Sequence, residues 1–402
     1  MFGVKFSFHR VGLALVGLLL ASACLPGLVP AAHAGQGTGA FEGYTITKLA
    51  SLDTVHRSLF GNNTADKPFI DSLDWHGTAD EDSFFVFRYC PDPQSCVIAT
   101  ASPDGKVIQT AFDPPNQYVS LSGAKVSPEG NALLFKARLQ DQSDQLFVWI
   151  KGTSALVQLT NGTQVQAYSW TNASRVAYVE SSSQLTCDGG AEQCSNPRYD
   201  YNSRIWVARP TGEKVRTFYQ EHSFIIDFAL SPDEKKLAYT SFTGNPADPR
   251  KELRLSVFDP QTGASKVMLS NRNDDTYYTP KWAPSGDALL YAGLTSDSIP
   301  GRSGEKVTPT GALEILSMNG DTGRVAIAGN STGAVPFGYT VSKDGQHIYF
   351  AVNQDLAGDG IDGPGIYRMQ LAHPIPEFPL AGLVAIVSIG TAVAAARMRR
   401  AT

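Results

Sequence analysis

Six copies of one short pattern run along this chain, and this repeat constrains the fold more than any other feature. Each copy has an apolar residue, a short turn, and a run of aliphatic residues with an aromatic residue at or near its end. These apolar leads stand 51, 44, 60, 52 and 59 residues apart and are Trp75, Val126, Trp170, Leu230, Trp282 and Val341. Such a repeat predicts an array of one supersecondary unit rather than several unrelated domains.

The composition of each unit explains its local structure. In the fourth unit, Ser-Pro-Asp at 231–233 precedes the apolar run Leu-Ala-Tyr at 237–239. Proline fixes φ, and the glycines found in other copies accept positive φ, so these residues favour a tight turn between two strands. Two more β-type runs follow, at 253–258 and 266–269. Four antiparallel strands in a period of roughly 40–60 residues predict one blade of a β-propeller.

These units resemble the TolB-like, PD40-type (WD40-like) propeller repeat, whose signature is a Ser-Pro-Asp-Gly turn followed by an aliphatic-aromatic strand. The fourth unit is the best copy, and the resemblance covers residues 40–371. The first unit lacks the Ser-Pro turn, and the third has Thr171-Asn172 in its place. The resemblance implies an all-β, six-bladed propeller of four-stranded antiparallel blades within residues 35–372.

Ring closure needs one strand from elsewhere in the chain. The sixth unit supplies strands at 337–341, 346–352 and 365–371, which is one strand short of a blade. Before the first unit lies an unassigned β-type run, Tyr44–Leu49. We therefore expect the N-terminal strand to complete the last blade, which removes the free edges of the ring.

The first 34 residues have the pattern of a signal peptide. Basic residues Lys5 and Arg10 precede an apolar run at 11–24, and a small-x-small site follows at 32–34. This order of regions is typical of a cleaved secretory signal. Two alternatives remain: an N-terminal membrane anchor, and lipidation of Cys24, whose preceding residues loosely resemble a lipobox.

The C-terminal segment has three parts. Residues 373–379 are a Pro-rich spacer, residues 380–396 carry no charge, and residues 397–402 contain three arginines. A helix over the middle part would be about 25 Å long, just enough for a thin membrane span. The arginines predict a cytoplasmic end. Together with the signal peptide, this predicts an extracellular body on the cell surface.

The tail also resembles the three-part sorting signals that exosortase and archaeosortase systems read. The motif Pro-Glu-Phe at 376–378 carries the resemblance, and this form of the motif is similar to archaeal ones. The resemblance implies that the anchor is cut off during sorting. A plain, uncut C-terminal anchor is the alternative.

Charge excludes one large class of partners. Without the basic residues of the first segment and of the tail, the body at 35–374 keeps 28 Lys and Arg against 37 Asp and Glu, a formal charge of −9. A body of this charge has no broad electrostatic attraction for nucleic acid. We therefore expect no nucleic-acid partner.

The cysteines and sequons fit an oxidising, extracellular compartment. Local spacing favours two disulfides, Cys90–Cys96 and Cys187–Cys194, over a zinc site, because neither the cysteine spacing nor the histidines follow a zinc pattern. Four Asn-x-Ser/Thr sequons predict a glycoprotein, at Asn62, Asn161, Asn172 and Asn330.

One face of the predicted ring has longer connections than the other. If strands A to D run outward from the axis, the A–B turns are tight and the B–C connections are long. The long ones are Glu180–Ser203, Thr243–Glu252, Thr295–Gly311 and Asn353–Pro364. Long loops on a rigid scaffold commonly carry binding, although neutral insertion is the alternative. We expect a protein, peptide or glycan ligand on this face.

Candidate ligand-binding residues stand at the starts of the innermost strands and in one loop. These positions should line the axial mouth on the loop-rich face, and their carboxylate, amide and aromatic groups suit a sugar, a peptide or a cation. The candidates are Asp71, Gln166, Asp227, Asp274, Asp275, Tyr277 and Tyr278.

A calcium site is the one cofactor candidate. Three carboxylates, Asp355, Asp359 and Asp362, stand in a Gly-rich segment, and calcium prefers such oxygen ligands. The segment lacks the spacing of an EF-hand, and Asp-Gly is also ordinary turn sequence.

The sequence contains no catalytic motif in a context that supports it. There is no Walker loop, and the one Gly-x-Ser-x-Gly match, at 329–333, is followed by Pro336 and not by the helix that a nucleophile elbow opens. No catalytic residue is assigned, and the sequence favours a ligand-binding or scaffold module on the cell surface. The alternative is a surface enzyme, a glycan lyase or hydrolase, with its site at the axial mouth. A cluster of carboxylates and aromatics at that mouth would favour the enzyme.

Overall fold

The computed structural model describes the repeat region with short gaps. Described are residues 44–62, 68–77, 83–92, 95–113, 118–153, 155–162, 164–187, 197–243, 252–270, 276–295, 310–318, 322–325, 338–353, 357–358 and 361–371. Outside these ranges lie the signal segment, the C-terminal tail, Asp274, Asp275, Cys194, Asn330, Asp355 and Asp359. Among the described residues, no helix has the length and apolar character that a membrane crossing needs.

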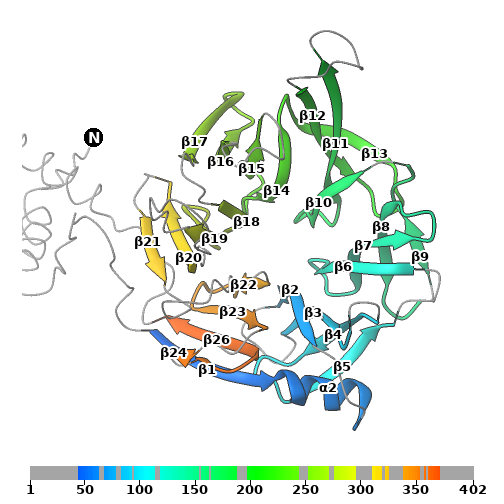
Figure 1. Ribbon diagram of the computed structural model, residues 1–402, viewed down its shortest axis with the longest axis vertical. Helices are drawn as coiled ribbons and strands as arrows, with labels where there is room; N and C mark the ends of the chain where they lie inside the picture. The colour runs from blue at the N-terminus through cyan, green and yellow to red at the C-terminus, as the bar shows by residue number, and fades with distance from the viewer. Residues whose placement is uncertain are drawn as a thin grey trace, which may run out of the picture. The chain divides into compact units, whose positions relative to one another are not determined.

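Six four-stranded antiparallel sheets are arranged around a central axis (Figure 1), which confirms the predicted six-bladed propeller. Blade 1 contains β2 (Phe69–His76), β3 (Phe84–Cys90), β4 (Val97–Ala101) and β5 (Ile108–Phe112). Blade 2 contains β6 (Tyr118–Val126), β7 (Ala132–Leu139), β8 (Asp144–Ile150) and β9 (Leu156–Gln158). Blade 3 contains β10 (Val165–Trp170), β11 (Val176–Cys187), β12 (Pro197–Ala208) and β13 (Lys214–Glu221).

The other three blades follow the same order of strands from the axis outward. Blade 4 contains β14 (Phe224–Leu230), β15 (Leu237–Phe242), β16 (Leu253–Asp259) and β17 (Ala264–Ser270). Blade 5 contains β18 (Thr276–Trp282), β19 (Ala288–Thr295), β20 (Thr310–Ser317) and β21 (Thr322–Val325). Blade 6 contains β22 (Tyr339–Val341), β23 (His347–Val352), β26 (Gly365–Leu371) and β1 (Tyr44–Ser51).

The apolar core is divided among the interfaces between neighbouring blades. Phe85 and Phe87 of β3 pack toward blade 6, whereas Val86 between them packs toward blade 2. Alternate residues of a strand point to opposite faces of its sheet, so a continuous apolar run serves both neighbours of a blade. Six such clusters join the blades in sequence, including the one between blades 6 and 1.

The N-terminal strand closes the ring, as the sequence predicts. β1 pairs antiparallel with β26, with Tyr44 opposite Leu371 at one end and Ser51 opposite Gly365 at the other. The side chains of Tyr44 and Ile46 pack against the apolar cluster between blades 5 and 6. Blade 6 is therefore built from both ends of the repeat region.

A short helix that the sequence analysis did not predict connects the last blade to the first. α2 (Leu52–Phe60) begins at Ser51, whose Oγ accepts the backbone N–H of Thr54 at 3.0 Å. It ends at Gly61, whose φ of 72° suits a residue without a side chain. Val55 of the helix is buried in the cluster between blades 6 and 1. The helix thus covers the joint where the ring closes.

The structure describes both cysteines of only one of the two predicted disulfides. Cys90 and Cys96 form a disulfide between the end of β3 and the residue before β4, which confirms the first pairing. Cys187 ends β11, and its predicted partner lies outside the described residues. The second pairing therefore stays a prediction.

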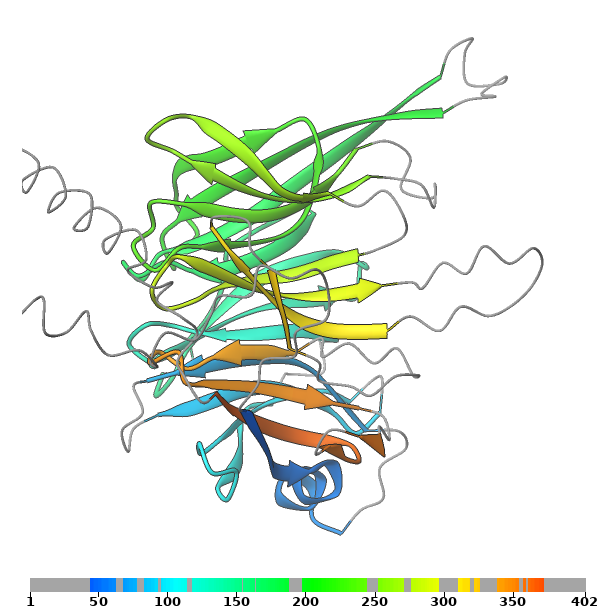
Figure 2. The same cartoon turned by 90° about the vertical axis from the view of Figure 1, so that its left-hand side faces the viewer.

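The segment Glu180–Ser203 is not the long loop that the sequence analysis predicted. β11 and β12 continue through most of it as a two-stranded ribbon that pairs Val176 with Ala208 at one end and Cys187 with Pro197 at the other. The ribbon projects beyond the other strands (Figure 2). The expectation was wrong because it interpreted the polar residues of this segment as a loop, although Thr186, Tyr199 and Tyr201 are of types that favour strands.

Candidate functional site

A cavity of about 1120 Å³ lies on the axis of the ring. Its walls are the innermost strands β2, β6, β10, β14, β18 and β22 and the turns that follow them (Figure 1). At one end it reaches the tight A–B turns, including Ser127-Pro128, Thr171-Asn172 and Ser231-Pro232. The cavity thus extends to the face opposite the long B–C connections, where the sequence analysis placed no binding surface.

A β-bulge interrupts five of the six innermost strands at equivalent positions. The register shifts lie between Ile70 and Ser72, Ser122 and Lys125, Val165 and Tyr168, Ile225 and Asp227, and Tyr278 and Lys281. A bulge bends its strand and changes where side chains point, and bulges are common beside functional sites. In this protein the bulges determine which side chains of the innermost strands line the cavity.

Three of the predicted ligand-binding residues line this cavity: Asp71, Gln166 and Asp227. Tyr277 and Tyr278 lie in β18, and their side chains are not described. Whether the three lining residues bind a ligand stays a prediction.

Asp71 is held by an arginine of its own blade. Its Oδ2 lies 2.6 Å from Nη2 of Arg88 on β3. Burial raises the pKa of the Asp71 carboxyl, and the Arg88 charge opposes this rise. Asp71 Oδ1 and Arg88 Nε find no hydrogen-bond partner in the described structure, so both retain capacity for a ligand or water.

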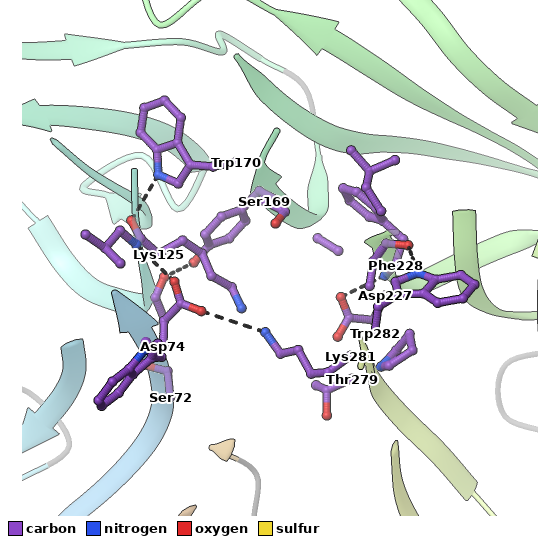
Figure 3. A pocket seen from close by; sticks show the side chains of 18 of the residues that line it. Ser72, Asp74, Lys125, Ser169, Trp170, Asp227, Phe228, Thr279, Lys281 and Trp282 are labelled. Atoms are coloured by element: carbon purple, nitrogen blue, oxygen red, sulfur yellow. Dashed lines mark hydrogen bonds and ion pairs between the residues drawn. The ribbon is translucent and has the colours of Figure 1, made fainter. Parts of the chain in front are cut away.

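Four charged side chains meet farther along the cavity: Asp74, Lys125, Asp227 and Lys281 (Figure 3). Lys281 Nζ lies 4.0 Å from Asp74 Oδ1, and Asp74 Oδ2 accepts the backbone N–H of Val126 at 3.1 Å. Asp74 and Asp227 both act electrostatically on Lys125 and Lys281, and the two lysines also act on each other. We call these four residues the charge cluster.

The surroundings shift the pKa values of this cluster. Burial, together with the Lys125 charge, lowers the pKa of Lys281 to about 7, although Asp74 and Asp227 oppose the change. Burial raises the pKa of Asp227, and the two lysines oppose that rise. The side chains of Lys281 and Asp74 nevertheless keep 23% and 18% of their surface exposed. Both can therefore meet a molecule in the cavity.

Hydrogen bonds between neighbouring innermost strands hold the cavity wall in place. The indole N–H of Trp170 donates to the backbone oxygen of Lys125 at 3.1 Å, and that of Trp282 donates to Ala229 at 2.9 Å. The Tyr168 hydroxyl donates to the backbone oxygen of Ser122 at 3.0 Å. These bonds join each strand to the preceding blade, so the backbone that carries Lys125 is tied to blade 3.

The sequence analysis missed three members of the charge cluster, although the repeat contains a signal for them. Asp74, Lys125 and Lys281 each stand one residue before an apolar lead. The analysis considered only positions three and four residues before the leads, which identified Asp227. An alignment of the six units at the position immediately before the apolar lead would have identified Asp74 and the two lysines as equivalent charged residues.

Metal binding has no support among the described side chains. Within the described part of the chain, no group of three or more His, Cys, Asp or Glu residues is placed to hold a metal ion. Of the calcium candidates, Asp362 lies in β25 (Ile361–Asp362), which pairs with β24 (Ala357–Gly358), and its side chain is not described. The other two lie outside the described residues, so the calcium site stays a prediction.

The predicted glycosylation positions in the described structure are all exposed: Asn62, Asn161 and Asn172. Asn172 lies in an A–B turn at the cavity wall, and its side-chain amide donates to the backbone oxygen of Pro232 in the next blade. A glycan on this amide would stand at the end of the cavity.

No family model matches the chain, and no curated protein matches it. Solved structures of similar fold include an oligogalacturonate lyase in complex with manganese, with 15% identity, a TM-score of 0.45 and coverage of 77% of this chain and 78% of that one. TolB from Acinetobacter baumannii shows 17% identity, a TM-score of 0.43 and coverage of 73% and 66%. The β-propeller domain of the Trilobed protease from Pyrococcus furiosus shows 11% identity, a TM-score of 0.42 and coverage of 73% and 81%. The chain is similar to these proteins, and its six blades are assigned from its own strand pairing.

Proposed function

We propose that this protein is a ligand-binding propeller module and that its binding site is the central cavity. The observation that carries the proposal is the charge cluster inside a cavity of about 1120 Å³. Pockets for small ligands commonly have volumes of about 300–1,000 Å³, so this cavity admits a sugar chain end or a short peptide segment. A protein, peptide or glycan ligand is the expected partner.

The lining suits a polar ligand with an apolar face. Trp75, Trp170 and Trp282 line the cavity beside the charge cluster. Aromatic rings supply apolar contact, and carboxylates and amines supply directed hydrogen bonds. Because the innermost strands are tied to one another, the site needs little ordering when it binds, which favours affinity.

A surface enzyme, a glycan lyase or hydrolase, is the second candidate. Carboxylates and aromatics do converge in the cavity, which is the feature expected of the enzyme. Asp227 has a raised pKa, and Lys281 has a pKa lowered to about 7. Groups shifted toward neutrality suit proton transfer. Product formation from a bound glycan would favour the enzyme, whereas unchanged ligand would favour the binding module.

Filling the cavity should abolish binding. We expect the full chain, tested on glycan and peptide arrays, to bind at least one class of ligand. In the variant Ser169→Trp, a large ring replaces a small residue of the cavity wall, and affinity should fall by at least about tenfold, which corresponds to about 1.4 kcal/mol. The control Gln261→Trp adds the same ring to an exposed turn of blade 4 and should bind as the wild type does. Equal binding by all three proteins would exclude the cavity as the site.

We also propose that the body is extracellular and anchored to the cell surface by the segment 380–396. The order of signal, spacer, uncharged segment and arginines supports this topology. Deletion of residues 375–402 should release the protein into the medium, as cell fractionation would detect. The variant with Ala at positions 376–378 keeps the uncharged segment and should stay with the membrane, uncut. A deletion variant that remains in the membrane fraction would contradict the C-terminal anchor.

A further inference from the structure

Opposite blades of the ring carry equivalent polar residues at the cavity wall. Lys125 of β6 in blade 2 stands one residue before its apolar lead, and so does Lys281 of β18 in blade 5. Tyr168 of blade 3 and Tyr339 of blade 6 each stand two residues before theirs. All four line the cavity, and their blades lie opposite each other in pairs, 2 with 5 and 3 with 6 (Figure 1). In these residues the wall has approximate twofold symmetry about the axis.

The β-bulges of blades 2 and 5 follow the same symmetry. The register shifts between Ser122 and Lys125 in blade 2, and between Tyr278 and Lys281 in blade 5. Each bulge thus comes directly before a lysine, and a bulge changes where the following side chains point. The two lysine side chains extend into the cavity and point toward each other (Figure 3).

The two tyrosines hold the bulges from the neighbouring blades. The Tyr168 hydroxyl donates to the backbone oxygen of Gly123, two residues before one lysine. In the same way, the Tyr339 hydroxyl donates to the backbone oxygen of Thr279, two residues before the other. Thr279 has a φ of 48°, a left-handed conformation that a β-branched residue rarely adopts. Such strain persists where the surrounding structure imposes it, and it is common at ligand sites.

The two ammonium groups have hydrogen-bond donors that the protein does not use. Within the described part of the chain, Lys125 Nζ has no hydrogen-bond acceptor and no ion-pair partner. Lys281 Nζ has one ion-pair partner there, Asp74 Oδ1 at 4.0 Å, which is beyond hydrogen-bond distance. An ammonium carries three N–H donors. The space between the lysines therefore suits a ligand group that supplies acceptors.

The two aspartates of the charge cluster still allow an anion to bind there. Asp74 Oδ2 accepts the backbone N–H of Val126 at 3.1 Å. Asp227 Oδ1 accepts the backbone N–H of Phe228 at 2.8 Å. Charge-assisted N–H···O bonds are about 2.7–2.9 Å long. A ligand carboxylate at that distance from Lys281 would be closer to its ammonium than Asp74 is, and Coulomb attraction grows as the distance falls.

We propose that Lys125 and Lys281 together bind the carboxylate of an acidic sugar, with one carboxylate oxygen accepting from each lysine. The inference rests on the proposed function, because it names the class of ligand that the cavity takes. A carboxylate has two equivalent oxygens, which match two equivalent lysines on opposite sides of the axis. The hydroxyls of a sugar ring both donate and accept, and the aspartates and lysines of the wall offer partners of both kinds.

The inner edge of the ring favours a sugar over a peptide end with the same carboxylate. A peptide added to a strand edge needs free backbone groups for its main-chain hydrogen bonds. Tyrosine and tryptophan side chains already bond to five backbone oxygens of the innermost strands, those of Ser122, Gly123, Lys125, Ala229 and Thr279. The indole N–H groups of Trp170 and Trp282 are used in these bonds, so their rings offer apolar contact.

A matched pair of sugars tests the proposal on the full chain. Methyl β-D-glucuronide and methyl β-D-glucoside differ only in a carboxylate against a hydroxymethyl group. At pH 6, below the pKa of about 7 that Lys281 has in this structure, both lysines carry a proton. Titrations followed by saturation-transfer NMR should give a Kd for the glucuronide at least about tenfold lower, because hydrogen bonds between charged groups are the stronger ones. Acetyl-Ala-Ala and its C-terminal amide test the peptide alternative in the same way.

Variants test whether the two lysines cause this preference. Lys125→Met and Lys281→Met should each lower the ratio of the two sugar affinities, and the double variant should bring the ratio to about one. The ratio is the useful quantity because a distorted cavity would weaken both sugars together. The control Lys235→Met makes the same change of charge on an exposed turn of blade 4, where 64% of the side chain is accessible, and should keep the ratio of the wild type.

Equal affinity of the wild type for the two sugars, or binding of neither, would overturn the proposal without any variant. A preference for the free dipeptide over its amide, without a preference for the glucuronide, would assign the site to peptide ends instead. A loss of preference in Lys235→Met as large as in the cavity variants would overturn the role of the pair. Array binding that Ser169→Trp leaves intact contradicts the proposed function itself, whereas cavity-dependent array binding with equal sugar affinities contradicts only the acidic sugar.

Discussion

Deletion of β1, residues 44–51, is expected to cost the propeller at least about 5 kcal/mol of its free energy of unfolding. β1 supplies the outermost strand of blade 6 and pairs with β26 along its length. Its loss removes the partial burial of Tyr44 and Ile46 against the core between blades 5 and 6, where full burial of a side chain contributes about 1.5–3 kcal/mol. It also removes the backbone hydrogen bonds to β26, each worth about 0.5–1.5 kcal/mol. It also leaves β26 as an unpaired edge, which favours aggregation. Since domains are stable by only about 5–15 kcal/mol, the variant should aggregate or unfold at much lower denaturant concentration.

Two point variants separate loss of closure from damage to the segment itself. Ile46 packs against the core, whereas the adjacent Thr47 is exposed. Ile46→Asp should cost about 3 kcal/mol because it places a carboxylate against an apolar cluster. Thr47→Asp should change stability by less than about 0.5 kcal/mol. Equal denaturation midpoints for the two variants would contradict the closing role of β1.

Much of the fold was predictable because six copies of one sequence pattern all predict the same unit, a four-stranded blade. The Ser-Pro-Asp turns and apolar runs predict where the first two strands of each blade meet, and counting strands in the last unit predicts that Tyr44–Leu49 closes it. The helix α2 and the β11–β12 ribbon were not predicted. Each occurs once, so no other copy reinforces its pattern. Nine helical residues also give too little periodicity to be distinguished from a strand, even though Ser51 and Gly61 provide caps.

The candidate site was less predictable than the fold, for a geometric reason. The lining of the cavity depends on β-bulges in the innermost strands, and an extra residue in a strand changes which side chains face the axis. Strict alternation from the apolar lead cannot account for Asp74 and Lys281, which lie next to leads that also line the cavity. The pairing of Asp71 with Arg88 on the next strand was likewise not visible in the spacing of the repeat.

The second large effect is expected at Asp74. This carboxylate faces Lys281 at 4.0 Å and accepts the Val126 N–H at 3.1 Å. Asp74→Ala leaves the two lysines with one fewer counter-charge and the N–H without its acceptor, which should cost about 2–4 kcal/mol. Lys281→Met removes the amine without leaving a like-charged pair, and the double variant should be more stable than the sum of the single effects by at least about 1 kcal/mol. Denaturant unfolding of the four proteins at pH 5, where a Lys281 with a pKa of about 7 carries its proton, measures this coupling.

The exposed pair Asp104–Lys106 provides a matched control for that cycle. Its atoms lie 2.9 Å apart, closer than those of Asp74 and Lys281, but both side chains are largely exposed. Exposed ion pairs contribute little because water screens them, so Asp104→Ala and Lys106→Met should show no resolvable coupling. Coupling in the control as strong as in the cavity would mean that burial does not strengthen the charge cluster.

The pH dependence of stability distinguishes a neutral Lys281 from an ordinary charged one. Its pKa in the folded protein is about 7, below the value of about 10.4 for a lysine in the unfolded chain. Between these values the unfolded chain binds more protons, so this residue makes the free energy of unfolding rise as pH increases from 7 toward 10. Asp227 acts in a lower range: its raised pKa means that the folded state binds more protons there, and stability falls as pH rises through that range.

The wild type should therefore gain stability on the order of 2 kcal/mol between pH 7 and 9.5, and the variant Lys281→Met should not show this gain. If the two proteins show parallel pH profiles in this range, Lys281 is fully protonated, the carboxylates outweigh burial and Lys125, and the cavity holds two complete ion pairs rather than a free amine.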